Sequence, residues 1–415
     1  MNTQTRTGPA PGFELAALPP GAPATARAVF RLLARLRHGR LDVQLPDGSS
    51  ASFGSLHDSG DVRAAIRLRN WAVCAAALKS GDIGFAESYI AGDWSTPDLA
   101  ALLRLFIANR DEIESVVYGN WWGALLYRLR HLLNRNSRAG SRKNIHAHYD
   151  LGNAFYKLWL DETMSYSSAW FDGDASRGMV DGQLAKVRRA LREAGVRPGS
   201  RVLEIGCGWG GLAEVAAREF GAHVTGVTLS SEQLDWARTR LDRAGLADRT
   251  DLRLQDYRDI PEARFDAIVS IEMFEAVGRE YWDGWFRTVA GKLAPGARAC
   301  VQSITIRDDL FERYVRGTDF IQQYIFPGGL LPSVSVFEAE AARHGLVVEQ
   351  TLRFGTDYAE TLKRWRERFM GEEAHVRKLG FDTRFVRTWE FYLAYCEAAF
   401  ATGNTDVVQF TLRRA

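Results

Sequence analysis

The stretch "SRVLEIGCGWGG" (200–211) decides the fold, because it joins a short apolar strand to a glycine-rich loop. The residues that follow, "LAEVAAREF" (212–220), have the apolar spacing of an amphipathic helix. Gly206, Gly208 and Gly211 form the pattern G-x-G-x-x-G after the strand and before the helix, which is the context of a nucleotide-binding loop. The stretch therefore predicts the first β–loop–α unit of a nucleotide-binding sheet.

Strands and helices alternate downstream of this loop. The apolar patterns predict strands at 222–230, 251–257, 265–274 and 297–306, and helices at 231–245 and 279–293. This alternation predicts an α/β fold with a doubly wound, mostly parallel sheet. Two late apolar segments, 345–355 and 407–415, are compatible with an antiparallel edge on the same sheet.

The amino-terminal part has a different organisation. Residues 1–24 are rich in Pro, Gly, Ala and Thr and are expected to form a flexible leader. Residues 25–114 predict a small α+β domain, with a hairpin that turns at Pro46-Asp47-Gly48. The next segment, 115–145, is basic and aromatic; it is either a solvated interdomain linker or a contact for anionic lipid headgroups.

Composition limits the class of protein. With a net charge of +2 among 415 residues, we expect no nucleic-acid partner. The cysteines, Cys74, Cys207, Cys300 and Cys396, lack ligand spacing, so neither a metal site nor a disulfide framework is expected, and a cytoplasmic location fits. No apolar run reaches the ~18 residues of a membrane span, so contact with a membrane is expected to be peripheral.

The glycine pattern alone fits dinucleotide enzymes and S-adenosylmethionine (SAM) enzymes equally. A dinucleotide site favours a carboxylate at the end of the second strand, where this chain has "GVTLSSEQ" (226–233) and Ser230 is placed to cap a helix. Glu204, just before the loop, suits the cationic methionine end of SAM. "QDYRD" (255–259) offers Gln255, Asp256 and Tyr257 as a seat for adenine, or an ordinary loop. These features lean towards SAM.

Seven segments in order then resemble one known family. They are "HYDLGNAFYKLWLDETMSYSSAWF" (148–171), "VLEIGCGWGGLA" (202–213), "GVTLSSEQ" (226–233), "LQDYRD" (254–259), "IEMFEAVG" (271–278), "YIFPGGLLPS" (324–333) and "FGTDYAETL" (354–362). The chain resembles the cyclopropane fatty acid synthases, SAM-dependent enzymes that act on cis double bonds of phospholipid acyl chains. The resemblance implies a class I methyltransferase domain at 146–415, with an acyl-chain lid at about 305–345. It also implies a lipid-binding type of amino-terminal domain.

The resemblance implies two sets of site residues. The SAM contacts carried over are Tyr149, Tyr166, Ser167, Gly206, Gly208, Thr228, Leu229, Gln233 and Asp256, beside which Glu204, Gly210, Gln255 and Tyr257 are further candidates. A bicarbonate ion acts as base in the family, and its shell matches Ser168, Glu275, Gln302, Ile304 and Tyr358. An alkene that accepts a methyl cation becomes positively charged, so a wall of π faces is expected, with Trp170, Phe171, Phe274 and Tyr358 as candidates. Core packing is the alternative for each ring.

Three positions depart from the family pattern. Many bacterial members have Cys at Ser168 and His at Gln302 and Ala276, whereas Glu-Ala and Gln variants are similar to the plant-type branch. We therefore expect SAM-dependent methyl transfer to an unsaturated phospholipid chain, with a cyclopropane product and a methyl- or methylene-branched product as the alternative. A lipid carrier that only retains the fold is the alternative from another class. The expected location is the inner face of the membrane, and a homodimer is compatible with the sequence.

Overall fold

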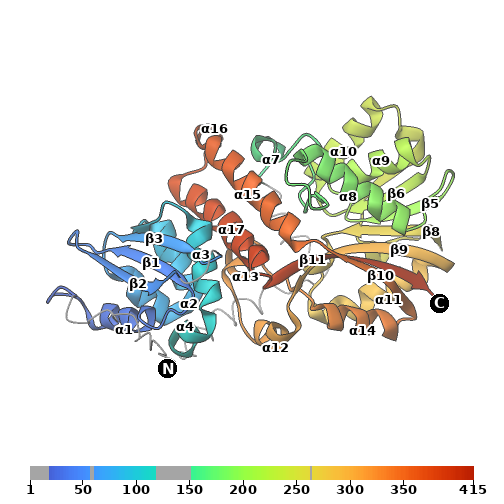
Figure 1. Ribbon diagram of the computed structural model, residues 1–415. Coiled ribbons are helices and arrows are strands. Elements are labelled where there is room, and N and C mark those ends of the chain that lie inside the picture. Colours follow the sequence, from blue (N-terminus) through green and yellow to red (C-terminus); the bar gives the residue numbers. More distant parts are fainter. Residues whose placement is uncertain (1–17, 57–59, 118–150, 262–263) are drawn as a thin grey trace, which may run out of the picture. The chain divides into compact units, whose positions relative to one another are not determined.

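The computed structural model describes residues 18–56, 60–117, 151–261 and 264–415 (Figure 1). These residues form two compact units, 18–117 with 382–402 and 151–381 with 403–415. The division differs from the expected linear one, because a segment near the carboxyl end groups with the amino-terminal unit. Residues 1–17 of the predicted leader and most of the basic segment 115–145 lie outside the described residues, while the last residues of the predicted leader lead into helix α1 (Ala24–Leu33), with Leu18 and Ala22 buried.

The first unit is a small α+β fold. Its four-stranded sheet has the order β2-β1-β3-β4, with β1 Gly39–Gln44 and β2 Ser50–Ser55 forming the predicted antiparallel hairpin. Strand β3 Arg63–Leu68 pairs parallel with β1, and β4 is Trp94–Ser95. The helices are α1 Ala24–Leu33, α2 Ala72–Ala91, α3 Leu99–Ala108, α4 Arg110–Val117 and α17 Thr383–Ala401. Helix α17 packs on α2 and α3. Two hydrogen bonds join it to α2, from Tyr395 to Asp82 and from Tyr89 to Glu390.

The second unit contains a seven-stranded sheet of order β10-β11-β9-β8-β5-β6-β7. The strands are β5 Arg201–Ile205, β6 His223–Thr228, β7 Thr250–Leu254, β8 Phe265–Ile271, β9 Leu293–Ile306, β10 Leu346–Arg353 and β11 Thr405–Arg414. All pairings are parallel except those of β11, which runs antiparallel to both β9 and β10. Each predicted strand is thus confirmed, as is the antiparallel edge.

Helices cover both faces of this sheet (Figure 1). Helices α8 Met179–Glu193, α9 Gly211–Glu219 and α10 Ser231–Arg243 lie on one face over a core of small aliphatic side chains. Helices α11 Trp282–Lys292 and α14 Val334–Arg343 lie on the other, over an aromatic core around Phe274, Trp285 and Phe337. The remaining helices are α7 Asn153–Trp159, α12 Asp308–Arg316, α13 Phe320–Tyr324, α15 Gly355–Gly371 and α16 Glu373–Lys378.

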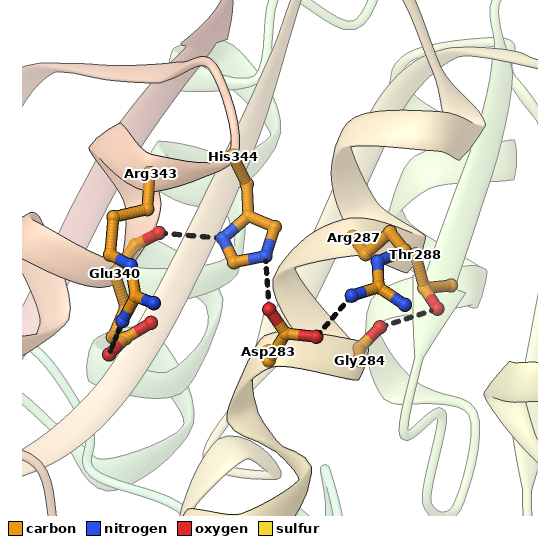
Figure 2. A network of polar contacts seen from close by, with 7 residues as sticks. All are labelled: Asp283, Gly284, Arg287, Thr288, Glu340, Arg343 and His344. Atoms are coloured by element: carbon orange, nitrogen blue, oxygen red, sulfur yellow. Dashed lines mark hydrogen bonds and ion pairs between the residues drawn. The ribbon is translucent and has the colours of Figure 1, made fainter.

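A polar network ties α11 to the end of α14 (Figure 2). The His344 ring lies 2.9 Å through Nδ1 from the Glu340 carbonyl and 3.0 Å through Nε2 from the Asp283 carboxylate. Asp283 also pairs with Arg287 one turn along α11. The network joins the two helices that cover the aromatic face of the sheet.

Candidate active site

A pocket of about 190 Å³ opens at the carboxyl ends of β5, β6 and β8. Strand order reverses between β5 and β8, and ligands of open α/β sheets bind at such a reversal. Eleven of the predicted cofactor residues line the pocket: Tyr166, Ser167, Glu204, Gly206, Gly208, Thr228, Leu229, Gln233, Gln255, Asp256 and Tyr257. Tyr149 lies outside the described residues.

The glycine loop is shaped by left-handed backbone. Gly206 has φ +91°, and a Cβ there would lie 2.9 Å from the Met273 side chain. Gly210 has φ +80° but does not line the pocket; a Cβ there would lie 2.9 Å from the Ala237 side chain on α10. Gly210 is therefore needed for packing of the loop against α10, while Gly206, Gly208 and Gly211 form the wall of the pocket.

Glu204 is the buried acid beneath this loop. Burial raises the pKa of its carboxyl well above the ordinary value, with only the Ala213 amide acting against it. Its Oε2 atom is buried and has no hydrogen-bond partner among the described residues. An orphaned carboxylate oxygen at the wall of a pocket fits a ligand that brings an ammonium group.

The ends of β6 and β7 supply further polar groups. Ser230 caps α10 by accepting a hydrogen bond from the Gln233 amide at 3.3 Å, as predicted. The Thr228 hydroxyl donates to the Gln233 carboxamide at 3.2 Å. Arg258 clamps the Asp256 carboxylate with bonds of 2.8 and 2.6 Å, and burial raises the pKa of Tyr257 to about 12. This arrangement presents fixed acceptors and an aromatic ring, which suits a nucleoside.

Glu272, which follows β8 and lines the pocket, is the centre of the polar cluster. Its Oε1 atom accepts from the Ser168 amide at 2.9 Å and from the Gln302 carboxamide at 2.7 Å. Its Oε2 atom accepts from the Tyr358 hydroxyl at 2.6 Å. Burial raises the pKa of Glu272, while the Lys186 charge and these three donors oppose the rise. Sequence reasoning missed this residue and placed the centre at Glu275.

Glu275 lies behind the pocket rather than on its wall. Its carboxylate accepts from the Ile304 amide and, at 3.1 Å, from the Ser303 hydroxyl, so it holds the loop after β8 against β9. Burial and the neighbouring Glu272 charge raise the pKa of Glu275 to about 8. The structure thus brings Ser168, Gln302 and Tyr358 together around Glu272, and Glu275 and Ile304 together beside them.

Two expectations are corrected at this point. Ser168 faces the acidic cluster through its backbone amide, because its hydroxyl donates to the Ala169 carbonyl at 2.8 Å. None of the four rings predicted for the wall, Trp170, Phe171, Phe274 and Tyr358, lines the pocket; Phe274 packs in the aromatic core on the far face, and the Tyr358 hydroxyl donates to Glu272. The rings that do line it are Tyr166, Trp209 and Tyr257.

A buried chain of hydrogen-bonded side chains fixes the orientation of Gln302, which donates to Glu272. Gln409 on β11 lies opposite Gln302 on β9 and donates to its carbonyl oxygen at 3.0 Å. Arg189 donates to the Gln409 carbonyl oxygen at 2.6 Å. The direction of each bond fixes the Gln302 amide with its NH₂ towards Glu272. A signal for Gln409 was present, since it is a lone polar residue in an apolar strand, as Gln302 is.

Lys186 of α8 is also missing from the sequence-based prediction. It lines the pocket and donates to the Ser167 hydroxyl and the Gln183 carbonyl oxygen, both at 2.6 Å. Burial lowers the pKa of Lys186 to about 8, against the opposing charges of Glu272 and Asp161. Its position in an amphipathic helix gave no sign that the amine turns inward.

The residues present do not fit a bicarbonate ion in the expected place. Three groups assigned to its shell, the Ser168 amide, Gln302 and Tyr358, already donate to the Glu272 carboxylate. A second anion there would face the Glu272 carboxylate, whose three donors are already engaged. We therefore route no step through bicarbonate.

Comparison with known proteins assigns the chain. Residues 136–410 match the family described as mycolic acid cyclopropane synthetase. The chain belongs to this family. The tuberculostearic acid methyltransferase UfaA1 of Mycobacterium tuberculosis is 39% identical over 95% of this chain and 93% of its own length. The cyclopropane-fatty-acyl-phospholipid synthase of Escherichia coli is 35% identical over 86% of this chain and 89% of its own.

Solved structures agree with this assignment to the cyclopropane synthetases. The mycolic acid cyclopropane synthase CmaA1 in complex with S-adenosylhomocysteine (SAH) and CTAB is 30% identical and covers 66% of this chain and 98% of its own, with a TM-score of 0.61. The chain is thus a SAM-dependent methyltransferase with the class I fold, as expected. The pocket fits SAM, because the orphaned Glu204 oxygen suits its ammonium group and the Asp256–Tyr257 end suits its adenosine.

Proposed function

We propose that this enzyme transfers the methyl carbon of SAM to a cis double bond of an unsaturated acyl chain in a membrane phospholipid. The observation that carries the proposal is the Glu272 carboxylate on the wall of the cofactor pocket, with three donors around it and Lys186 nearby. An enzyme that methylates an alkene needs a base beside the methyl group. A lipid carrier has no use for such a group.

The chemistry follows from the weak nucleophilicity of an alkene. SAM supplies an electrophilic methyl group on a positively charged sulfur. Glu204 binds and orients the methionine end, and Asp256 and Tyr257 hold the adenosine end. Methyl transfer leaves positive charge on the neighbouring alkene carbon. The Tyr166 ring and the Glu272 charge stabilise that cation, with ~0.5–2 kcal/mol expected from a ring face. Loss of a proton then completes the reaction.

The substrate proposal rests on the relatives and on the basic segment. The Escherichia coli relative is named for a fatty-acyl phospholipid, which is a substrate presented by a membrane surface. Residues 115–145 carry basic and aromatic side chains, which suit anionic headgroups. Each Lys or Arg near such a surface contributes ~1 kcal/mol to binding. No helix among the described residues has the length and apolar character to cross a membrane. We propose peripheral binding at the inner membrane face.

Two products share this site. Loss of a proton from the added methyl group closes a cyclopropane ring, which is our first candidate. A hydride shift before proton loss gives an exocyclic methylene branch, and conversion of that product to a saturated methyl branch requires a separate hydride donor. The second candidate is favoured by the 39% identity with a tuberculostearic acid methyltransferase over nearly the whole chain. The same residues serve both outcomes until the proton leaves.

An assay with purified protein tests the proposal. Carbon-13 methyl-labelled SAM is incubated with vesicles of mono-unsaturated phospholipid, and the lipid is analysed by proton and carbon NMR. We expect label in the acyl chain, with cyclopropane and methylene protons separating the two products. Vesicles of saturated phospholipid are the matched control. Label in neither lipid, or methylation of a soluble compound alone, would overturn the proposal.

A further inference from the structure

The carboxylate of Glu272 lies where three hydrogen-bond donors converge, as they would around a bound anion. It uses the Ser168 amide, the Gln302 carboxamide and the Tyr358 hydroxyl, which come from three separate segments of the catalytic unit. A carboxylate offers about four lone-pair positions, and three are taken. Among the described residues Oε1 accepts two bonds and Oε2 accepts one, which leaves one position on Oε2 for a proton.

The backbone directs this side chain into the pocket. Glu272 has φ +48°, in the left-handed region that costs a non-glycine residue ~1–2 kcal/mol. Its amide donates to the Gln302 carbonyl at 2.8 Å, which fixes the turn directly after β8. Strained backbone conformations cluster at functional sites, and here the strained residue directs its carboxylate into the cofactor pocket.

We propose that Glu272 is the base of the reaction, in place of a bound anion. This inference rests on the proposed function. The alkene π electrons form the bond to the methyl carbon, and the carbon–sulfur bond breaks with its electron pair going to sulfur. A C–H bond beside the resulting cation then breaks, and its electrons close the ring or form the new double bond. The proton goes to Glu272 Oε2 and leaves to water after the products dissociate.

The charged groups around Glu272 are consistent with this role. Lys186 on α8 favours the ionised form of Glu272, and the Glu272 charge in turn raises the pKa of Glu275. Gln302 and Tyr358 hold the two oxygens in place without supplying charge. Because burial raises the pKa of Glu272, its carboxylate is a stronger base than one in water. Glu275 is not among the residues that line the pocket, and its carboxyl group accepts from the Ile304 amide and the Ser303 hydroxyl.

Replacement of the side chain gives the test. Glycine tolerates the left-handed backbone, so Glu272→Gly is expected to fold and to leave the three donors around an empty space. We expect its turnover to fall on the order of 100-fold. Added bicarbonate or formate should restore it by about tenfold or more, while wild type in carbon-dioxide-free buffer keeps its full rate. Glu272→Gln is the isosteric second variant, and the exposed Glu280→Gln is the control.

Binding of the anion provides a readout apart from turnover. Carbon-13 bicarbonate NMR should detect binding to Glu272→Gly and none to wild type, with SAH affinity unchanged in calorimetry. Wild type that binds bicarbonate in this pocket, or that loses its rate without it, overturns the inference while the proposed function stands. If wild type labels no lipid under any condition, the proposed function fails, and the NMR comparison still decides whether Glu272 fills the anion site.

Discussion

At the scale of single residues, Glu204 and Glu272 line the same pocket but differ in their hydrogen-bond partners. Glu272 has its oxygens directed by three donors, so it is set to exchange a proton. Glu204 has one oxygen without a partner among the described residues and lies under the glycine loop. We propose that Glu204 binds the cofactor and that Glu272 takes the proton.

Glu204→Gln should therefore weaken cofactor binding. A hydrogen bond to a charged group is worth ~1.5–3 kcal/mol, which corresponds to a loss of about 10- to 100-fold in affinity. Calorimetry with SAM and with its product SAH measures this, and Glu280→Gln serves as the exposed control. Unchanged affinity in a folded Glu204→Gln protein would contradict the role of Glu204.

At the scale of elements, the pairing of β9 with β11 sets the Gln302 amide. Gln409 lies opposite Gln302 in the antiparallel register and is itself fixed by Arg189. In Gln409→Leu the Gln302 amide loses its partner and is free to rotate. We expect kcat to fall about tenfold with the KM for SAM unchanged, since the cofactor wall is intact.

Steady-state kinetics separates the two parameters, and Thr411→Val on the same strand is the control. Thr411 bonds Glu193, which pairs with Arg189, so this substitution removes an interaction that lies further from Gln302 than Gln409 does. If Gln409→Leu and Thr411→Val lower kcat equally, or if only KM changes, the positioning role of Gln409 is wrong.

Most elements could be predicted from sequence because each carries its own periodicity. The strands of the large sheet, the hairpin at Pro46-Asp47-Gly48 and the cap at Ser230 are all local patterns. The grouping of α17 with α2 and α3 depends on contacts between residues far apart in the chain, which no local pattern encodes.

The membership of the site was predictable only in part, and its geometry was not predictable. Gln302 and Tyr358 were found, and the structure brings them together, but around Glu272 rather than Glu275. Which glutamate of "IEMFE" (271–275) faces the pocket depends on the left-handed turn at Glu272 and the 3-10 turn Phe274–Ala276. Likewise the backbone, and not the hydroxyl, of Ser168 faces the cluster, which a motif cannot tell.

At the scale of the whole molecule, the buried acids couple stability to pH. The pKa of Glu275 is raised from 4.5 to about 8 in the folded protein. Between these values the native state keeps a proton that the unfolded chain has lost. The free energy of unfolding therefore falls as pH rises through this window, by up to ~1.4 kcal/mol per pH unit for one proton.

Glu275→Gln is neutral at every pH, so its free energy of unfolding should fall less steeply with pH than that of wild type. Urea denaturation without cofactor, at about pH 5.5 and about pH 8, measures the two slopes. Parallel slopes for wild type and Glu275→Gln would contradict a raised pKa for the Glu275 carboxyl.

The central claim is methyl-carbon transfer from SAM to an unsaturated acyl chain, and the most direct measurement is made on cellular lipids. The chain is expressed in a bacterial host that lacks its own synthase, and the fatty acids are analysed by mass spectrometry and proton NMR. The account predicts acyl chains heavier by one CH₂ group, formed at the expense of mono-unsaturated chains and strongly reduced with Glu272→Gly. An unchanged fatty-acid profile with the folded wild-type protein present would contradict it.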